Sequence, residues 1–261
     1  MKIGFIGCGN MAKAIIDGIL ASKIVKPSDI FASAQDFKKL QIYCHSCRIT
    51  ASQNAQTAQE GDIIILAVKP QKFAEILPTI QSEVKGKLII SIAAGKTIDF
   101  IASYLGEEKI IRIMPNLNAA VKQSVSAMCA NKKCNDEDIK ITKQIFMSIG
   151  KVYEVAEENF SAFSAAACCS PAFTFMYIDA LAKGAVACGL DEKTAYSAAI
   201  DAVKGSAAML ENATDSAAQL VKKVCSPGGT TIEGVNILTE NSFEDTVKKA
   251  VNASYEKDKS L

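Results

Sequence analysis

The chain has 261 residues, of which 49% are hydrophobic, and its formal net charge is +1. This length suits one large domain or two ordinary ones, and the apolar fraction can build a sizeable core. The near-neutral charge excludes the strongly basic surface typical of nucleic-acid-binding proteins, and it excludes an acidic tail. Small metabolites are therefore the expected partners, with neither nucleic acid nor membrane among them.

The first residues, MKIGFIGCG, pass from one lysine and a short apolar run straight into glycines. They lack the long apolar core and cleavage site of a signal peptide, so we expect a cytoplasmic protein. Nine scattered cysteines favour reduced thiols over a disulfide framework. Cys44 and Cys47 have the spacing of a zinc half-site, but no second pair completes it, and no metal is expected. Residues 160–178 carry no charge, yet polar residues and a proline interrupt them, which favours a buried helix over a membrane span.

Strand and helix signals alternate in the first part of the chain. Short apolar runs, several rich in β-branched residues, predict strands at residues 2–6, 30–34, 62–68, 87–93 and 109–114. Helical spacing predicts helices between them, at residues 10–22, 69–84 and 97–105, and Pro78 should kink or split the second of these. The alternation predicts an α/β fold with a Rossmann-type, mostly parallel, doubly wound sheet.

Strand signals stop after about residue 157. Ala-rich and shorter helical patterns follow at residues 160–189, 191–212, 215–225, 231–238 and 242–255. We therefore predict two domains, a Rossmann-type domain over residues 1–157 and an all-α domain over residues 158–261. Small residues let helices approach closely, so the second domain is expected either to pack against another copy of itself or to form a compact monomeric bundle.

A glycine-rich stretch, GFIGCGNMA, stands between the first predicted strand and the first predicted helix. Gly7, Gly9 and Ala12 have the G-x-G-x-x-A spacing of a dinucleotide-binding turn. Gly7 permits the tight turn, Gly9 lets the backbone approach a pyrophosphate, and Ala12 lets the helix pack close to the strand. The N-terminus of the helix would then donate N–H groups to the pyrophosphate.

The end of the second predicted strand bears on which dinucleotide binds. Ser33 and Gln35 occupy the place where sites for NAD usually carry an acidic residue, and Lys38 and Lys39 follow. Small polar and basic residues accommodate a 2′-phosphate, which favours NADPH as the cofactor. NADH stays an alternative because Asp36 lies nearby and the lysines could equally form a solvated helix face.

Four segments, in this order along the chain, resemble the pyrroline-5-carboxylate reductase family. They are GFIGCGNMAKAI at residues 4–15, LAVKPQ at 66–71, RIMPN at 112–116 and VCSPGGTTIEGV at 224–235. The resemblance implies a nucleotide-binding domain followed by a helical dimerisation domain, and hence a homodimer or a higher homo-oligomer. It also implies the reaction, the last step of proline biosynthesis, in which hydride from NADPH reduces the C=N bond of 1-pyrroline-5-carboxylate to give L-proline.

The resemblance also assigns site residues. It implies that the cofactor is bound by the glycine turn, by the adenosine-side and groove residues, and by a nicotinamide-side segment: Gly7, Cys8, Gly9, Asn10, Met11, Ser33, Asn54, Ala67, Val68, Lys69, Met114, Pro115 and Asn116. It implies that substrate is bound by Ser226, Gly228, Gly229, Thr230 and Thr231.

The chemistry of the substrate agrees with these residue types. A cyclic imine that is protonated or hydrogen-bonded at nitrogen is already electrophilic, so the enzyme needs positioning more than a strong acid. By analogy with the family, Thr231 is the expected catalytic residue, since its hydroxyl can orient the imine nitrogen and assist proton supply. Consecutive N–H groups at Gly228, Gly229 and Thr230 would receive the substrate carboxylate.

Two segments depart from the pattern of the family. After RIMPN the family continues with Thr-Pro, whereas this chain has Leu117 and Asn118, and Ser170 stands where the family has a glycine before Pro171. Both departures lie in segments that the resemblance places near nicotinamide and substrate. Two further functions therefore stay open: a reductase of a related cyclic imine, and a non-catalytic paralogue that binds NADPH.

Overall fold

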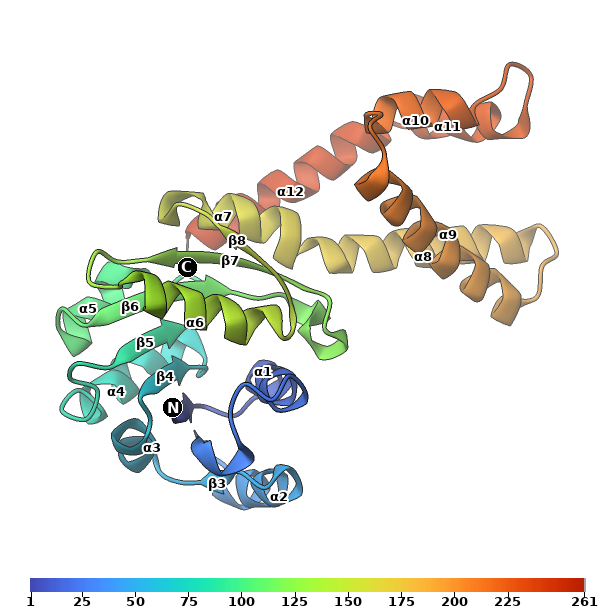
Figure 1. The fold of residues 1–261 in the computed structure, drawn as a ribbon. Coiled ribbons are helices and arrows are strands. Elements are labelled where there is room, and N and C mark those ends of the chain that lie inside the picture. Colours follow the sequence, from blue (N-terminus) through green and yellow to red (C-terminus); the bar gives the residue numbers. More distant parts are fainter. Residues whose placement is uncertain (261) are drawn as a thin grey trace. The chain divides into compact units, whose positions relative to one another are not determined.

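The computed structural model describes residues 1–260, which form two compact units (Figure 1). Unit 1 comprises Met1–Cys168 together with the C-terminal segment from Tyr255, and unit 2 comprises Cys169–Ser254.

A single sheet forms the centre of unit 1, with eight strands within the described residues, in the order β3-β2-β1-β4-β5-β6-β7-β8. The strands are β1 Ile3–Ile6, β2 Ile30–Ser33, β3 Thr50–Ala51, β4 Ile63–Leu66, β5 Leu88–Ser91, β6 Lys109–Met114, β7 Ser124–Ala130 and β8 Gly150–Glu154. The pairs from β3 to β6 are parallel, β6 and β7 are antiparallel, and β7 and β8 are parallel. The mostly parallel, doubly wound sheet that the sequence predicts is confirmed.

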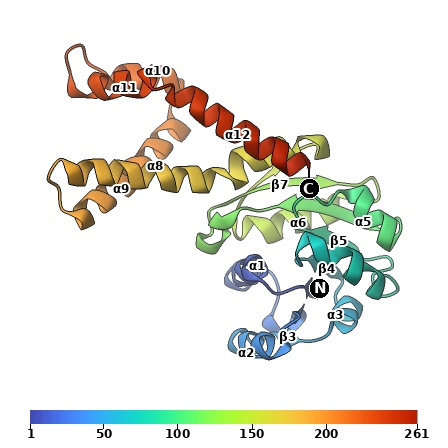
Figure 2. The ribbon, with the colours of Figure 1, turned by 180° about the vertical axis from the view of Figure 1, so that it is seen from behind.

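Helices cover both faces of this sheet (Figures 1 and 2). On one face, α1 (Asn10–Ala21), α2 (Phe37–Cys47) and α6 (Asp136–Met147) bury Ile15, Leu40 and Phe146 against the strands. On the other face lie α3 (Asn54–Glu60), α4 (Phe73–Ile76) and α5 (Ile98–Leu105), with a separate apolar core. Residues of β4 alternate between the two cores, as the period of two along a strand requires.

The region of residues 69–84 differs from the single kinked helix that the sequence predicts. It divides into a 3₁₀ turn at Pro70–Lys72, the short helix α4, and a second 3₁₀ turn at Leu77–Thr79. Each 3₁₀ turn carries a proline in its first two positions, and proline has no N–H to continue an α-helical ladder. The prediction of a break at Pro78 is therefore confirmed, but the predicted length is wrong.

Unit 2 is helical throughout and follows, along the chain, a distorted helical segment that belongs to unit 1. That segment comprises α7 (Phe160–Phe163) and a π-helix at Ser164–Cys168. Unit 2 holds α8 (Ser170–Ala187), α9 (Glu192–Asn212), α10 (Ala217–Val224), α11 (Thr230–Glu240) and most of α12 (Phe243–Lys259). Its small core is the contact between α8 and α9, where Ala182 and Ala195 are buried.

The expected buried helix near residues 160–178 is wrong for a single chain. The helical stretch Glu157–Ala187 is long and apolar enough, by length and composition alone, to cross a membrane, and only 17% of its most apolar window is buried. The physical reason is that α9 covers only one side of α8, whose side chains Phe175 and Met176 stay exposed.

Candidate nucleotide and substrate sites

The glycine turn after β1 has the geometry that its sequence predicts. Gly7 has φ of +98°, and a Cβ placed there would lie 2.7 Å from Cγ1 of Val68 and 2.8 Å from the backbone of Ala67. Only glycine fits this left-handed position without strain. Ala12 is fully buried, so α1 packs close to the sheet.

Gly9 forms the N-cap of α1 and opens its first turn to a ligand. No side chain caps the helix, and a Cβ at Gly9 would meet no atom within 4 Å. The first N–H groups of a helix have no partner within it, and together with the helix dipole they favour a bound anion. The turn therefore fits the pyrophosphate of a dinucleotide.

Ser33, predicted on the adenosine side, has its hydroxyl engaged inside the protein. The side chain is buried, and its Oγ donates to the Phe5 carbonyl at 3.2 Å and accepts from the Gly7 N–H at 3.4 Å. The Gly7 N–H also donates to the Ser33 carbonyl at 3.1 Å. The structure thus adds a role that sequence reasoning missed, because Ser33 holds the glycine turn in place; its contact with the cofactor stays a prediction.

Asp36, the acidic residue that left NADH open, is bound within its own helix. Its carboxylate caps α2 by accepting from the Lys39 N–H at 3.0 Å, and Nζ of Lys39 lies 3.3 Å away. These two interactions with Lys39 lower the pKa of the Asp36 carboxyl below its ordinary value. The positive charge of Lys39 therefore lies beside the Asp36 carboxylate. This pair fits a site for a 2′-phosphate better than an aspartate without a basic neighbour would.

The remaining predicted cofactor residues come together at one edge of the sheet. Ala67, Val68 and Lys69 follow β4, and Pro115 and Asn116 follow β6, whose last residue is Met114. Asn54 begins α3 just after β3. Since the carboxyl ends of parallel strands meet at the same edge, these residues share it with the glycine turn, where ligands of open α/β sheets bind.

The predicted substrate residues lie in unit 2, in the loop between α10 and α11. Gly228 has φ of +71°, and the Gly229 N–H donates to the Ser226 carbonyl at 3.0 Å, which closes a tight turn. Gly229 is the N-cap of α11, so Thr230 and Thr231 are its first two residues, and the helix begins one residue before the predicted start at residue 231. Within the described chain, the hydroxyls of both threonines make no hydrogen bond, and both residues are exposed.

This loop can bind a carboxylate through its backbone. No side chain caps α11, so the N–H groups of its first turn are free to donate to an anion. The loop provides donors and two hydroxyls without any buried cation, which suits a small substrate that carries a carboxylate beside a polar nitrogen.

The departures from the family pattern also have a place in the structure. Leu117 begins a 3₁₀ turn, Leu117–Val121, and its side chain is exposed, as is that of Val121. Ser170 is the first residue of α8.

Sequence reasoning missed the buried Arg112, which lies two residues before Met114. A charged residue inside the apolar run KIIRIM indicates that a partner of opposite charge is needed, and the structure shows that this partner is Glu157.

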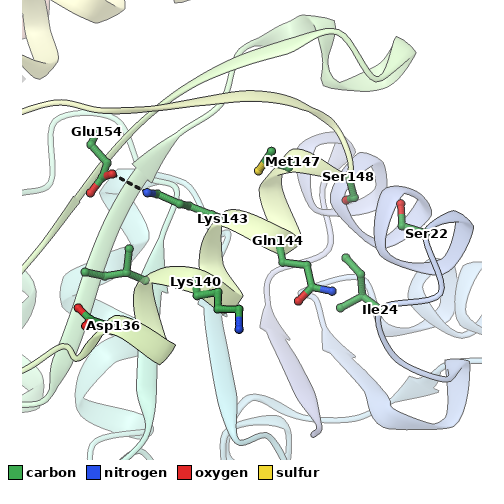
Figure 3. Close-up of a pocket in the computed structure, with 10 residues that line it drawn as sticks. Ser22, Ile24, Asp136, Lys140, Lys143, Gln144, Met147, Ser148 and Glu154 are labelled. Carbon is green, nitrogen blue, oxygen red and sulfur yellow. Dashed lines mark hydrogen bonds and ion pairs between the residues drawn. The ribbon is translucent and has the colours of Figure 1, made fainter.

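The pocket in Figure 3 is distinct from all of these residues. It has a volume of about 800 Å³ and lies between the end of α1, helix α6 and strand β8. Lys143 pairs with Glu154 there at 2.5 Å, and Lys140 and Asp136 bring one further charge of each sign (Figure 3). None of the predicted site residues lines it, and it lies at the end of α1 opposite to the glycine turn.

Comparison with known proteins covers the whole chain. Residues 157–261 match the family model for pyrroline-5-carboxylate reductase dimerisation, and residues 2–95 match the model described as NADP oxidoreductase coenzyme F420-dependent. The pyrroline-5-carboxylate reductase of Escherichia coli is 40% identical over 263 residues, which covers 100% of this chain and 98% of that protein. The enzyme of the same name from Aquifex aeolicus is 36% identical over 100% of this chain and 97% of its own length.

Solved structures give the same relationship. The NADP-bound pyrroline carboxylate reductase of Plasmodium falciparum superposes with a TM-score of 0.92 at 32% identity, covering 100% of this chain and 97% of that chain. The 1-pyrroline-5-carboxylate reductase of Streptococcus pyogenes has the same TM-score and identity, covering 100% and 99%. Prephenate dehydrogenase from Aquifex aeolicus, at 14% identity and a TM-score of 0.57, shares the fold alone. The chain described here belongs to the pyrroline-5-carboxylate reductase family.

Proposed function

We propose that this chain reduces the C=N bond of 1-pyrroline-5-carboxylate with hydride from NADPH, giving L-proline. The hydride adds to the imine carbon and a proton adds to the nitrogen while NADPH is oxidised to NADP⁺, so no second reductant is needed. The observation that carries the proposal is the loop of residues 226–231, because a protein that only bound a nucleotide would not need its free N–H groups and hydroxyls. The full-length relationship to enzymes of this name supports it.

The residues of the chain would supply binding and orientation. The Gly7–Gly9 turn and the first turn of α1 fit the pyrophosphate, since the space beside Gly9 is open. The N–H groups at Gly228 and Thr230 would hold the substrate carboxylate. The Gly229 N–H, predicted to join them, donates to the Ser226 carbonyl instead. The Thr231 hydroxyl would hydrogen-bond to the imine nitrogen and assist its protonation. Lys39, which neutralises Asp36, supports NADPH over NADH.

We propose that the enzyme works as a homodimer or a higher oligomer in the cytoplasm. Unit 2 presents an apolar groove lined from α8 to α12, with Met176, Tyr177, Phe243 and Val247 among its side chains. Met176 is 72% exposed in the single chain. An apolar surface of this kind is typical of an interface, and a second copy is the occupant that the dimerisation model supports. Within residues 1–260 the nine cysteines form no disulfide, which fits a reducing compartment. Light scattering of the purified protein should show a dimer or larger; a monomer at micromolar concentration would contradict this.

The test of the reaction is NADPH oxidation by purified protein with 1-pyrroline-5-carboxylate, followed by detection of proline. A non-catalytic paralogue would bind NADPH and form no proline, and a reductase of another cyclic imine would turn over only the alternative substrate. Comparing kcat/KM with NADPH and NADH tests the cofactor preference in the same assay.

Thr231 is tested by replacing its hydroxyl while keeping its shape. Thr231→Val should lower kcat by about tenfold or more, because positioned proton donors contribute about 10²–10⁴-fold, with NADPH affinity unchanged. Thr231→Ser retains the hydroxyl and should keep most of the turnover. Equal kcat in wild type and Thr231→Val would remove Thr231 from the mechanism.

A further inference from the structure

The side chain of Asn116 joins three segments of unit 1. It is 4% exposed, and its Nδ2 donates to the Ala167 carbonyl at 2.8 Å. Its Oδ1 accepts from the N–H of Asn118 at 3.2 Å and from that of Val125 at 3.3 Å. One amide group therefore ties the end of β6 to the following 3₁₀ turn, to β7 and to the π-helix Ser164–Cys168.

The Ala167 carbonyl needs a donor from outside its own helix. In an α-helix it would receive the N–H of residue 171, but that residue is a proline and has none. The next N–H, of Ala172, donates to the Cys169 carbonyl at 3.1 Å. Asn116 thus satisfies the carbonyl that the proline leaves without its usual partner, at a π-helical distortion of a kind that is frequent at functional sites.

The backbone of Asn116 is fixed at the same time. Its N–H donates to Oγ of the buried Ser124 at 3.1 Å. Asn116 directly follows Met114 and Pro115, so these bonds hold the segment that the family resemblance places beside the nicotinamide. Because both amide atoms are engaged inside the protein, the side chain is better suited to hold this segment than to contact a ligand.

We infer that Asn116 is a positioning residue for hydride transfer, which holds the segment 114–116 in place through the Ala167 carbonyl. This inference rests on the proposed reductase function. Misplacement of reacting groups by about 1 Å can cost about 100-fold in rate, so a loosened segment should lower turnover more than binding.

The test separates the bond to Ala167 from the other bonds of Asn116. Asn116→Asp keeps an oxygen acceptor for the Asn118 and Val125 N–H groups but replaces the donor to Ala167 by a second acceptor. The matched control is Gln123→Glu, which adds the same charge at an exposed position of the segment that follows Asn116; within residues 1–260 the Gln123 side chain makes no hydrogen bond. We expect Asn116→Asp to lower kcat about tenfold or more, with the Kd for NADPH changed by less than about threefold.

A second measurement covers the case in which Asn116→Asp does not fold. Pro171→Ala restores an N–H at residue 171 that can donate to Ala167, so Asn116→Ala should cost several-fold less in kcat in the Pro171→Ala background than in the wild type. Equal costs in both backgrounds would overturn the inference. So would a kcat for Asn116→Asp within twofold of wild type, or an equal loss in Gln123→Glu.

Hydrogen exchange distinguishes failure of this inference from failure of the proposed function. Amide exchange over residues 164–170 should be faster in Asn116→Asp and unchanged in Gln123→Glu, whether or not the protein turns over substrate. A wild type that forms no proline would refute the proposed function alone. Unchanged exchange in Asn116→Asp would refute the role of Asn116 at Ala167.

Discussion

Removal of the Glu157 carboxylate should destabilise unit 1, because that carboxylate serves two buried groups. Arg112, on β6, has a side chain that is 5% exposed, and its Nη1 lies 3.1 Å from Oε1 of Glu157. The same oxygen accepts from the N–H of Ile98, the first residue of α5, at 2.9 Å. Phe160 packs its ring 4.4 Å from the guanidinium carbon, and Nε of Arg112 has no partner within the described residues.

The magnitude follows from the groups that lose their partner in Glu157→Ala. A hydrogen bond to a charged group contributes about 1.5–3 kcal/mol and a neutral one about 1 kcal/mol. Breaking a fully buried ion pair costs about 3–5 kcal/mol, but Glu157 is 29% exposed, so water can replace part of its contact with Arg112. We expect a loss of about 2–3 kcal/mol for Glu157→Ala. Glu157→Gln keeps the acceptor oxygen and should lose about 1 kcal/mol.

Urea and thermal unfolding measure this difference. A loss of about 2–3 kcal/mol corresponds to a fall in Tm of about 4–12 °C for a chain of this size. Glu158→Ala removes the neighbouring carboxylate and should change stability by less than about 0.5 kcal/mol. If Glu157→Ala were no less stable than Glu158→Ala, the idea that Glu157 compensates the buried Arg112 would be refuted.

Two further predictions concern close packing and a thiol. At Gly18 a Cβ would lie 2.5 Å from Cγ2 of Ile149. We expect Gly18→Ala to lower the free energy of unfolding in urea by about 1 kcal/mol, because overpacking outweighs the gain in helix propensity. The control Gly205→Ala, where a Cβ on α9 meets no atom within 4 Å, should not lower it. Burial raises the pKa of the Cys8 thiol from 9.0 to about 11, so its alkylation, followed by mass spectrometry, should be slow at pH 8 and rise until about pH 11. The Cys8 thiol ionises at a lower pH in the unfolded chain than in the folded protein. The free energy of unfolding that the folded thiol contributes is therefore fully present below pH 9 and is lost between pH 9 and 11. Fast labelling of Cys8 at pH 8 in the folded protein would contradict the assignment.

The fold was most predictable where local pattern and tertiary packing agree. Strands such as β4, buried on both faces, are continuous apolar runs that need no knowledge of their neighbours. β7 reads SVSAMCA, which has little β-branched character, and its strand conformation depends on antiparallel pairing with β6. Helix α6 was missed although its signal is local, since Asn135 and Asp138 form a capping box at its start.

The candidate sites divide in the same way. The glycine turn and the 226–231 loop are local motifs, and backbone conformation at Gly7 and Gly228 follows from residue type. The roles of Ser33 and Asn116 depend on the Phe5 and Ala167 carbonyls, which lie 28 and 51 residues away along the chain. No spacing in the sequence identifies such distant carbonyl partners. A polar residue in a binding motif is therefore interpreted as a ligand contact even where its side chain holds the backbone.

Helix α8 shows why burial itself was mispredicted. An uncharged, Ala-rich helix has the same composition whether its own chain or a second copy covers it, because both remove apolar surface from water. The only buried residues of α8 in the single chain are Pro171 and Ala182, while Phe175 and Met176 stay exposed. The composition of α8 therefore predicts that this face is covered without saying by what. The sequence alone left a second copy and a monomeric bundle open, and the proposed oligomer would cover the side chains that the single chain leaves exposed.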